Sequence, residues 1–259
     1  MNYKVSIITP AFNDERYISE TIKSALGQTH TNFELIIIDD CSSDKTVDVI
    51  KSFNDERIVL IRNSENKGAA YSRNLGIKNA SGDYIAFLDG DDLWKENKLE
   101  KQLSFMIENN YSFSASKYSL INEEGSPLYI TYSAPKKMSH HTFLRFCPIG
   151  CLTAIYKREI YPDLSIPDSI KKRNDYALWI KLSERTNCYF LNENLAFYRK
   201  RRKSLSSGKK TSLLKYHIAL FKKIYGFSKV KANFYALRNV FYYIIKNLFY
   251  KRKNKKGRE

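Results

Sequence analysis

The sequence predicts an α/β protein with a mostly parallel central sheet, and two observations lead to this fold class. In the first hundred residues, short apolar runs rich in β-branched residues alternate with segments of amphipathic helical periodicity. Strands this apolar, separated by such helices, are typical of a parallel sheet that is covered on both faces. The chain has 259 residues, 43% of them hydrophobic, which is enough for a sizeable core.

The first half predicts four strands with helices between them. The strands are expected at residues 4–9, 34–39, 58–61 and 84–88. The helices are expected from a cap at Asn13 to residue 26, and at residues 46–53, 68–80 and 95–109. Ligands of parallel sheets bind at the carboxyl ends of the strands, and polar residues follow each of these runs. The functional loops are therefore expected at one edge of one sheet.

The second half is less regular. Strands are expected at residues 112–120, 128–133 and 152–156, and helices at residues 139–146 and 174–184. Residues 213–250 predict two helices that are broken near Gly226.

Charge is concentrated at the C-terminal end of the chain. Residues 199–259 contain 20 Lys and Arg and a single acid, a net charge of +19, whereas residues 1–198 have a net charge of −2. Such asymmetry indicates an anionic partner, either a nucleic acid or a membrane surface with acidic lipids. A nucleic acid is disfavoured because no recognition module is present and the acidic loops would repel phosphates. We therefore expect no nucleic-acid partner.

The same basic end carries an apolar helical stripe. Its members recur at helical spacing: Leu237, Val240, Phe241, Ile244, Ile245, Leu248 and Phe249. An apolar stripe with flanking cations and tyrosines suits a helix that lies in a membrane surface. The alternative is a helix packed on the catalytic domain or on a second subunit, so an oligomer is possible. With neither a leader peptide nor a spanning segment expected, we predict a peripheral protein on the cytoplasmic face of the membrane.

The four cysteines are scattered, which predicts reduced thiols rather than a disulfide framework. Cys147 and Cys151 are four residues apart, but no second pair at zinc spacing accompanies them, so a structural zinc is disfavoured.

The acidic loop that contains Asp89, Asp91 and Asp92 is the strongest candidate site. Three carboxylates within four residues repel one another, and a divalent cation relieves that repulsion. Hard oxygen ligands favour Mn²⁺ or Mg²⁺. The alternative is a solvated turn that caps the helix beginning near Trp94.

Other polar residues are expected near the same edge. Asp39 and Asp40 suit a ligand with hydrogen-bond donors, such as uracil or ribose, although an isolated Asp is usually a helix cap. Lys67 beside Gly68, and Arg73 after them, suit phosphate oxygens, the alternative being a turn and a surface helix.

Two further candidates lie in the second half. Asp175 stands near a helix start, where it is either a general base facing the acidic loop or a favourable charge in the first turn. Arg199 and Arg201 could bind phosphate, nucleic acid or nothing.

Taken in order, these motifs resemble the family-two inverting glycosyltransferases of GT-A fold. The resemblance is carried by the segments 9–13, 38–44, 66–74 and 87–92, and it extends over residues 4–207. The second half, with its segments 149–153, 172–179, 198–199 and 204–207, is similar to bacterial transferases that build teichuronic acid, capsule and lipopolysaccharide O-chains.

The resemblance implies roles for individual residues. Asp39 would bind uracil, Asp89 the ribose and Asp91 the metal, and Asp175 would be the catalytic base. The remaining nucleotide-sugar contacts would come from Thr9, Ala11, Lys67, Arg73, Gly90, Arg199 and Arg201. The chain departs from the family at two positions. Asn174 replaces one member of an acidic pair, and Arg201 stands where many members have histidine.

The implied organisation is a GT-A catalytic domain at residues 1–207 and a basic amphipathic helical tail at 208–259. Within the domain, residues 1–110 would bind the nucleotide-sugar and residues 111–207 the acceptor. The implied activity moves a sugar, expected from a UDP-sugar, to a hydroxyl of a lipid-linked or growing cell-surface glycan. The alternative is a non-catalytic scaffold that binds sugar nucleotides in a glycan-assembly complex.

Overall fold

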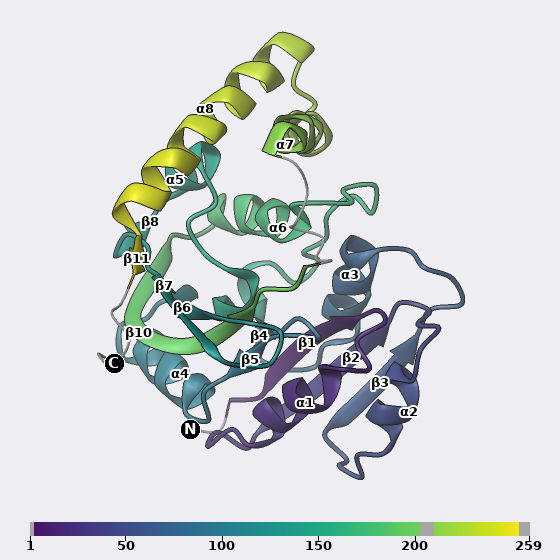
Figure 1. The fold of residues 1–259 in the computed structure, drawn as a ribbon. Helices are drawn as coiled ribbons and strands as arrows, with labels where there is room; N and C mark the ends of the chain where they lie inside the picture. The colour runs from purple at the N-terminus through teal and green to yellow at the C-terminus, as the bar shows by residue number, and fades with distance from the viewer. Residues whose placement is uncertain (1–2, 203–209, 254–259) are drawn as a thin grey trace.

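The computed structural model describes residues 3–202 and 210–253 (Figure 1). Eleven strands within these ranges form one continuous mixed sheet. Along its main path the order is β11-β7-β6-β9-β4-β1-β2-β3, while β10 pairs with β5, β6 and β8. The predicted α/β class, with helices on both faces of the sheet, is confirmed.

The first half of the chain forms the parallel part of the sheet. Strand β1 (Val5–Ala11) lies between β4 (Tyr84–Phe87) and β2 (Phe33–Asp39), and β3 (Ile58–Arg62) lies beyond β2. All four strands run in the same direction, and Ala11 is opposite Asp39 in the register. Their carboxyl ends therefore share one edge, as the sequence predicts.

Alternate residues of these strands point into two separate apolar clusters. Ile7 belongs to one cluster and Ile8 to the other, and both side chains are fully buried. The cluster with Ile7 is covered by α1 (Ile18–Leu26), α2 (Thr46–Lys51) and α4 (Lys98–Glu108). The cluster with Ile8 is covered by α3 (Ala69–Asn79) and α6 (Asn174–Ser183).

The second half of the chain extends the sheet mostly with antiparallel pairs, although β10 runs parallel to β6. Its elements are β5 (Leu93–Trp94), β6 (Phe113–Ile121), β7 (Pro127–Tyr132), β8 (Lys137–Met138), α5 (His140–Arg145), β9 (Ile155–Lys157) and β10 (Cys188–Arg199). Short 3₁₀ turns occupy Cys151–Thr153 and Arg158–Ile160. Strand β9 joins the two halves, because it pairs antiparallel with both β4 and β6.

Several predicted elements differ from the structure. Residues 151–153 form a 3₁₀ turn, so the strand expected at 152–156 begins only at Ile155. Asn13 does not cap α1, which begins five residues later; its side-chain oxygen instead accepts a hydrogen bond from the backbone N–H of Ser43. Strand β10 was not predicted, because apolar and polar residues do not alternate strictly along its sequence. In the structure, two register shifts interrupt its pairing with β6.

The C-terminal segment forms two helices, α7 (Lys210–Tyr225) and α8 (Lys229–Phe249), and the predicted break at Gly226 is confirmed by its positive φ of 64°. Among the described tail residues, four apolar side chains are buried in the core: Leu220, Phe221, Ala232 and Ala236. Helix α8 packs on α7 and on α5 (Figure 1). The chain then forms β11 (Lys251–Lys253), which pairs with β7. In the described ranges, no helix has the length and apolar character needed to cross a bilayer.

Candidate active site

The acidic loop follows β4 and is held against the end of β1. The Gly90 N–H donates to the carbonyl of Pro10 at 3.3 Å. A Cβ at position 90 would lie 2.8 Å from a carboxylate oxygen of Asp14, so only glycine fits here without displacing that side chain. The loop therefore lies at the predicted edge of the sheet, with Asp14 directly against it.

Arg201 bridges Asp91 of this loop and Asp14. Its Nη1 donates to Asp14 Oδ1 at 2.7 Å, and its Nε lies 2.6 Å from Asp91 Oδ2. The Nε–H bond does not point at the Asp91 oxygen, so this second contact is an ion pair rather than a hydrogen bond. The guanidinium thus supplies positive charge between two carboxylates that are both largely buried.

Burial and crowding shape the protonation of these carboxyl groups. Burial raises the pKa of Asp14, and the neighbouring Arg201 cation offsets only part of that effect. Burial also raises the pKa of Asp91, Arg201 opposes the rise, and Asp14 and Asp89 add to it by repulsion. The cluster therefore favours additional positive charge.

Arg73 connects the acidic loop to the start of α6. Its guanidinium donates one hydrogen bond to Asp89 and another to the side-chain oxygen of Asn174. Arg73 is 5% exposed, and the carboxylate of Asp89 raises its pKa despite burial, so it stays charged. Two segments that are 85 residues apart in sequence are thereby held together at this edge.

Asp175 lies next to Asn174 in the first turn of α6, and its side chain is partly exposed. The negative charge of Asp175 raises the pKa of Arg73 and that of the buried Cys151 thiol. The charge of Asp89 acts on the same thiol in the same direction. Burial raises the pKa of Cys151 well above its ordinary value, so this thiol is inert. Asp175 is thus on the same side of the molecule as the acidic loop.

Arg199 and Asp92 fasten the loop to the end of β10. Three donors of the Arg199 guanidinium reach the carbonyls of Asp91 and Glu123 and the carboxylate of Glu20. The Arg199 backbone N–H donates to Asp92 Oδ1 at 2.9 Å. Asp92 is 1% exposed and does not cap the following helix, whose N-cap is Asn97. In this structure both residues hold the loop in place.

Asp39 and Asp40 have different surroundings at the end of β2. Asp40 is an internal acceptor: its carboxylate takes hydrogen bonds from the backbone N–H groups of Lys67 and Gly68 and from the Asn63 amide. It shapes the turn, in which Gly68 has a φ of 89°. Among the described residues, the Asp39 carboxylate has long contacts: the Ser42 backbone nitrogen lies 3.3 and 3.4 Å from its two oxygens, and Arg62 forms an ion pair at 3.5 Å.

Thr9, Ala11 and Lys67 complete the predicted set at this edge. Thr9 is fully buried, and its hydroxyl has no hydrogen-bond partner among the described residues. Ala11 ends β1, where its carbonyl accepts from the Asp40 N–H. The Lys67 ammonium lies 4.8 Å from the centre of the Tyr71 ring and 3.8 Å from Glu65.

The structure brings together most of the predicted positions, and it adds one. Asp89, Asp91, Arg73, Arg201 and the start of α6 are joined by direct contacts. Asp14, which the sequence assigned to a helix start, is part of the same cluster. Its position just after the first strand could have indicated this. The Ser204–Ser207 motif lies outside the described residues.

A model of the family described as "Glycosyl transferase family 2" matches residues 6–163, which is more than half of the chain. The chain belongs to this family. Among its relatives, the putative teichuronic acid biosynthesis glycosyltransferase TuaG of Bacillus subtilis is 43% identical over 208 residues, covering 79% of this chain and 82% of that protein. The UDP-Glc:alpha-D-GlcNAc-diphosphoundecaprenol beta-1,3-glucosyltransferase WfgD of Escherichia coli is 41% identical, covering 80% of this chain and 81% of its own length.

Solved structures agree with the predicted GT-A fold. The S. aureus TarS fragment 1–349 in complex with UDP-GlcNAc superposes with a TM-score of 0.72 at 20% identity, covering 95% of this chain and 72% of TarS 1–349. The mannosyltransferase PcManGT from Pyrobaculum calidifontis, in complex with GDP-Man and Mn²⁺, gives a TM-score of 0.59 at 16% identity, with coverages of 92% and 74%. The chain is therefore a family-2 glycosyltransferase of GT-A fold.

The acidic cluster of this transferase fits a divalent cation that is shared with a phosphorylated ligand. The described residues contain no group of three His, Cys, Asp or Glu side chains that could hold a metal alone. Asp91 and Asp14 offer hard oxygen ligands whose charge Arg201 balances only in part. Mg²⁺ usually takes one or two carboxylates and completes its coordination with phosphate oxygens and water.

Proposed function

We propose that the protein is an inverting glycosyltransferase that uses a UDP-sugar and transfers the sugar to a hydroxyl of a lipid-linked or growing cell-surface glycan. The observation that carries this proposal is the Arg73 bridge, which joins Asp89 of the acidic loop to Asn174 at the start of α6. Asp175, the proposed base, follows Asn174 directly and would therefore lie near the edge where the sugar donor is expected. The diphosphoundecaprenol-linked acceptor named for WfgD supports a lipid-linked acceptor here.

The donor would bind along the carboxyl ends of the parallel strands. Asp39, with weak internal contacts, would accept a hydrogen bond from uracil, and the partly exposed Asp89 would bind the ribose hydroxyls. The backbone at Thr9, Ala11 and Gly90 would line the nucleotide site. UDP and UDP-GlcNAc in the matched TarS structures support a uridine nucleotide.

Arg201 and Lys67 would contact the diphosphate, because their cationic side chains are 24% and 35% exposed, respectively. Arg73 and Arg199 would support the donor site indirectly by holding the acidic loop, since their guanidinium groups already form hydrogen bonds with it. Asp91, with Asp14 beside it, would hold Mn²⁺ or Mg²⁺. When bound, this ion would stabilise the negative charge of the departing nucleoside diphosphate as a Lewis acid.

Asp175 would take the proton of the acceptor hydroxyl while that oxygen attacks the anomeric carbon. The new C–O bond forms on the face opposite the breaking bond to the diphosphate, and the bonding electrons leave with the nucleotide. A single displacement of this kind inverts the anomeric configuration. Asn174 cannot share the proton, so a single carboxylate serves as the base.

Replacement of the base tests the proposal directly. Asp175→Asn removes the proton acceptor and keeps the shape, so transfer is expected to fall by about 10²–10⁴-fold while UDP affinity stays unchanged. The measurements are sugar transfer to a lipid-linked acceptor and calorimetric titration with UDP. Asp163→Asn, on an exposed turn, is the matched control. Wild-type turnover in Asp175→Asn would exclude this residue as the base.

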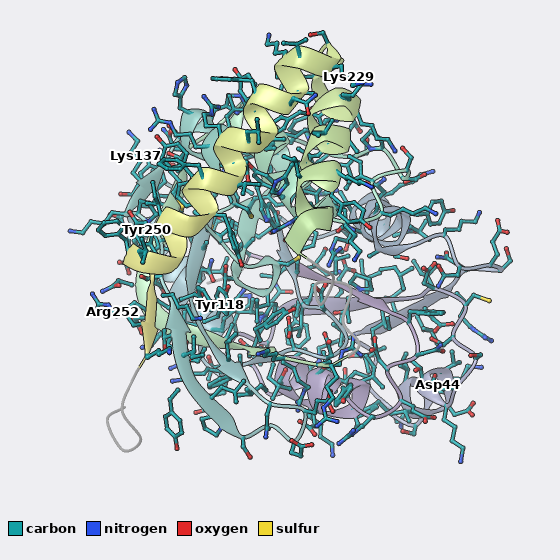
Figure 2. All side chains as sticks on the ribbon, turned by 45° about the horizontal axis from the view of Figure 1, so that its top comes forward. Asp44, Tyr118, Lys137, Lys229, Tyr250 and Arg252 are labelled. Carbon is teal, nitrogen blue, oxygen red and sulfur yellow. The ribbon has the colours of Figure 1, made fainter. Side chains whose placement is uncertain are left out.

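We also propose that the tail holds the protein on an anionic membrane surface at the cytoplasmic face. The support is the outer face of α8, defined here as Val230, Phe234, Leu237, Phe241, Leu248 and Phe249, whose exposed fractions range from 58% to 82%. Between residues 210 and 253 the chain carries eleven Lys and Arg and no acid. Apolar side chains flanked by cations suit an anionic lipid surface. Figure 2 shows α8 on the surface, between Lys229 and Tyr250.

The proposed division at residues 207 and 208 into a catalytic domain and a tail falls outside the described residues. The two parts share buried contacts, so we propose them as segments of one folded unit rather than as independent domains.

A further inference from the structure

The side chains on either side of Asp175 are both buried and both anchored. Asn174 is 5% exposed and Tyr176 is fully buried, whereas Asp175 between them is partly exposed. The first turn of a helix lacks internal partners for its N–H groups, and no side chain caps α6. The position of Asp175 therefore depends on what holds its two neighbours.

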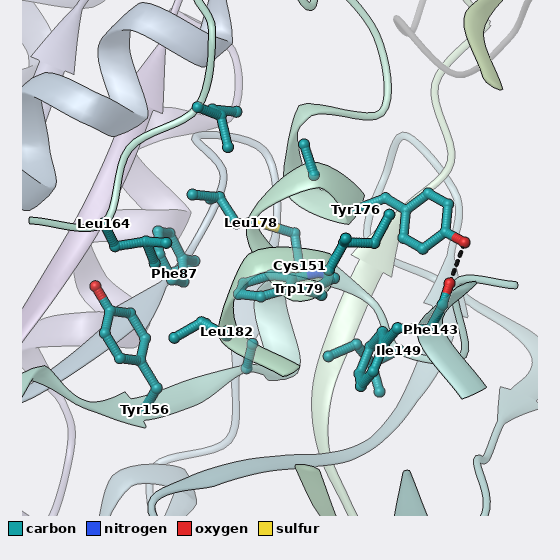
Figure 3. Close-up of a cluster of buried hydrophobic side chains, with 14 of the residues drawn as sticks. Phe87, Phe143, Ile149, Cys151, Tyr156, Leu164, Tyr176, Leu178, Trp179 and Leu182 are labelled. Atoms are coloured by element: carbon teal, nitrogen blue, oxygen red, sulfur yellow. Dashed lines mark hydrogen bonds between the residues drawn. The ribbon is translucent and has the colours of Figure 1, made fainter. Parts of the chain in front are cut away.

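Asn174 accepts a hydrogen bond from Arg73, which lies on the side of the proposed sugar-donor site. Tyr176 is held from the opposite side, by the C-terminal tail. Its hydroxyl donates to the carbonyl of Phe143 in α5 and accepts a hydrogen bond from the Asn239 side chain of α8. Figure 3 shows the Tyr176–Phe143 bond at the end of the apolar cluster that contains Trp179 and Cys151.

The hydrogen bond between Asn239 and Tyr176 lies in a buried environment. Asn239 is 3% exposed, and its side-chain amide donates directly to the Tyr176 hydroxyl. Burial raises the pKa of Tyr176 well above its ordinary value, so the hydroxyl keeps its proton. The ring of His217 from α7 meets the Tyr176 ring edge to face, with 6.1 Å between centroids. Both tail helices thus touch the residue next to Asp175.

We propose that Asn239 is a positioning residue for the active site, and that the tail sets the orientation of Asp175 through Tyr176. This inference rests on the proposed role of Asp175 as the base. A base must be held close to its productive position, and a displacement of about 1 Å can reduce turnover on the order of 10²-fold. Helix α8 then has two functions on two faces: the inner face holds the catalytic turn, and the outer face described above meets the lipid surface.

The test uses the full-length protein and the release of UDP from UDP-glucose, UDP-N-acetylglucosamine or UDP-galactose, whichever the wild type hydrolyses fastest. Asn239→Ala and Tyr176→Phe each remove the hydrogen bond between α8 and α6. Each is expected to lower kcat by about ten- to a hundredfold, with KM for the donor and UDP affinity unchanged. Tyr176→Phe also removes the bond to the Phe143 carbonyl. The double variant is therefore expected to lose no more than Tyr176→Phe alone, because that change already removes the bond that Asn239→Ala breaks.

Asn233→Ala is the matched control, since Asn233 lies on the same helix and donates only to the carbonyl of Lys229 within it. It is expected to keep the wild-type kcat. Vesicle binding is expected to survive in Asn239→Ala, because the outer face is intact. Conversely, Leu237→Gln with Phe241→Gln should lose vesicle binding and keep UDP release.

Three results would overturn the inference: a wild-type kcat in Asn239→Ala, additive losses in the double variant, or a loss of UDP affinity equal to the loss of kcat. The last result would indicate a general structural role. If Asn239→Ala does not fold, Asn239→Leu decides, since it removes the amide donor and keeps a side chain of similar size. The base assignment fails separately, by normal turnover in Asp175→Asn. With that variant inactive and Asn239→Ala normal, only the positioning role is wrong.

Discussion

At the scale of single residues, the site is organised around arginines placed between carboxylates. Arg201 lies between Asp14 and Asp91, and Arg73 pairs with Asp89. Without these cations, several buried acids would repel one another within one loop. A charge that is removed from such a cluster leaves its partners unpaired, which is more damaging than the loss of an exposed ion pair.

Replacement of Asp91 tests the metal proposal. Asp91→Asn removes one hard ligand, so the rise in thermal midpoint that Mn²⁺ and UDP produce together is expected to disappear, whereas UDP alone still binds. Differential scanning fluorimetry with and without Mn²⁺ measures the effect, and Asp163→Asn serves as the control. An unchanged response to Mn²⁺ would show that Asp91 is not a ligand.

Arg201 gives an independent test at the same scale. Arg201→Gln leaves Asp14 and Asp91 without their shared cation, so the free energy of unfolding is expected to fall by about 1–3 kcal/mol, less than for a fully buried pair because the side chain is 24% exposed. Urea denaturation checks this value. Mn²⁺ should restore part of the loss, because it supplies the missing positive charge. No loss of stability would contradict the proposed balance.

At the scale of elements, α7 places a buried histidine against the helix that carries Asp175. Burial, together with repulsion from Arg173, lowers the pKa of His217 to about 3. The native state therefore binds fewer protons than the unfolded chain between pH 3 and the ordinary value of 6.5. Native stability is complete above pH 6.5 and falls as the pH is lowered through this window.

The expected size of this effect is about 2 kcal/mol between pH 7 and pH 5, from about 1.4 kcal/mol per pH unit below the unfolded-state pKa. The glutamine of His217→Gln cannot be protonated, so the variant lacks this pH-dependent loss. The unfolding free energy of the wild type should therefore fall by this amount relative to that of the variant when the pH is lowered from 7 to 5. Chemical denaturation at the two pH values gives both quantities. A difference that does not depend on pH would mean that His217 is not buried in its neutral form.

At the scale of the whole molecule, the tail is both a part of the core and a candidate membrane surface. Because Leu220 and Phe221 are fully buried, deletion of the tail would expose the core, so point variants are the better probe. Leu237→Gln with Phe241→Gln is expected to abolish co-sedimentation with phosphatidylglycerol vesicles, and high salt should weaken wild-type binding. Val59→Thr, an exposed apolar residue of β3, is the control. Undiminished binding by the double variant would exclude the outer face of α8.

The sequence was sufficient for the N-terminal half of the fold. Its strands are so apolar, and the intervening helices so regular, that local periodicity and turn residues reveal them without tertiary contacts. The same regularity placed Asp39 and Asp89 at one edge, because parallel strands end together. In the second half the chain is less periodic. The turn at Cys151–Thr153 and strand β10 are determined by pairing with distant strands, which no local pattern reports.

Tertiary structure alone decided how the candidate residues work together. The sequence identified Arg73, Arg199 and Arg201 by their chemistry, but only long-range contacts show that Arg199 holds the loop while Arg201 faces Asp14 and Asp91. Likewise, the hydrogen bond of Asn239 to Tyr176 joins residues 63 positions apart. Periodicity records which face of an element is apolar. The partner that each polar side chain meets depends on how the elements pack, and that information is not local.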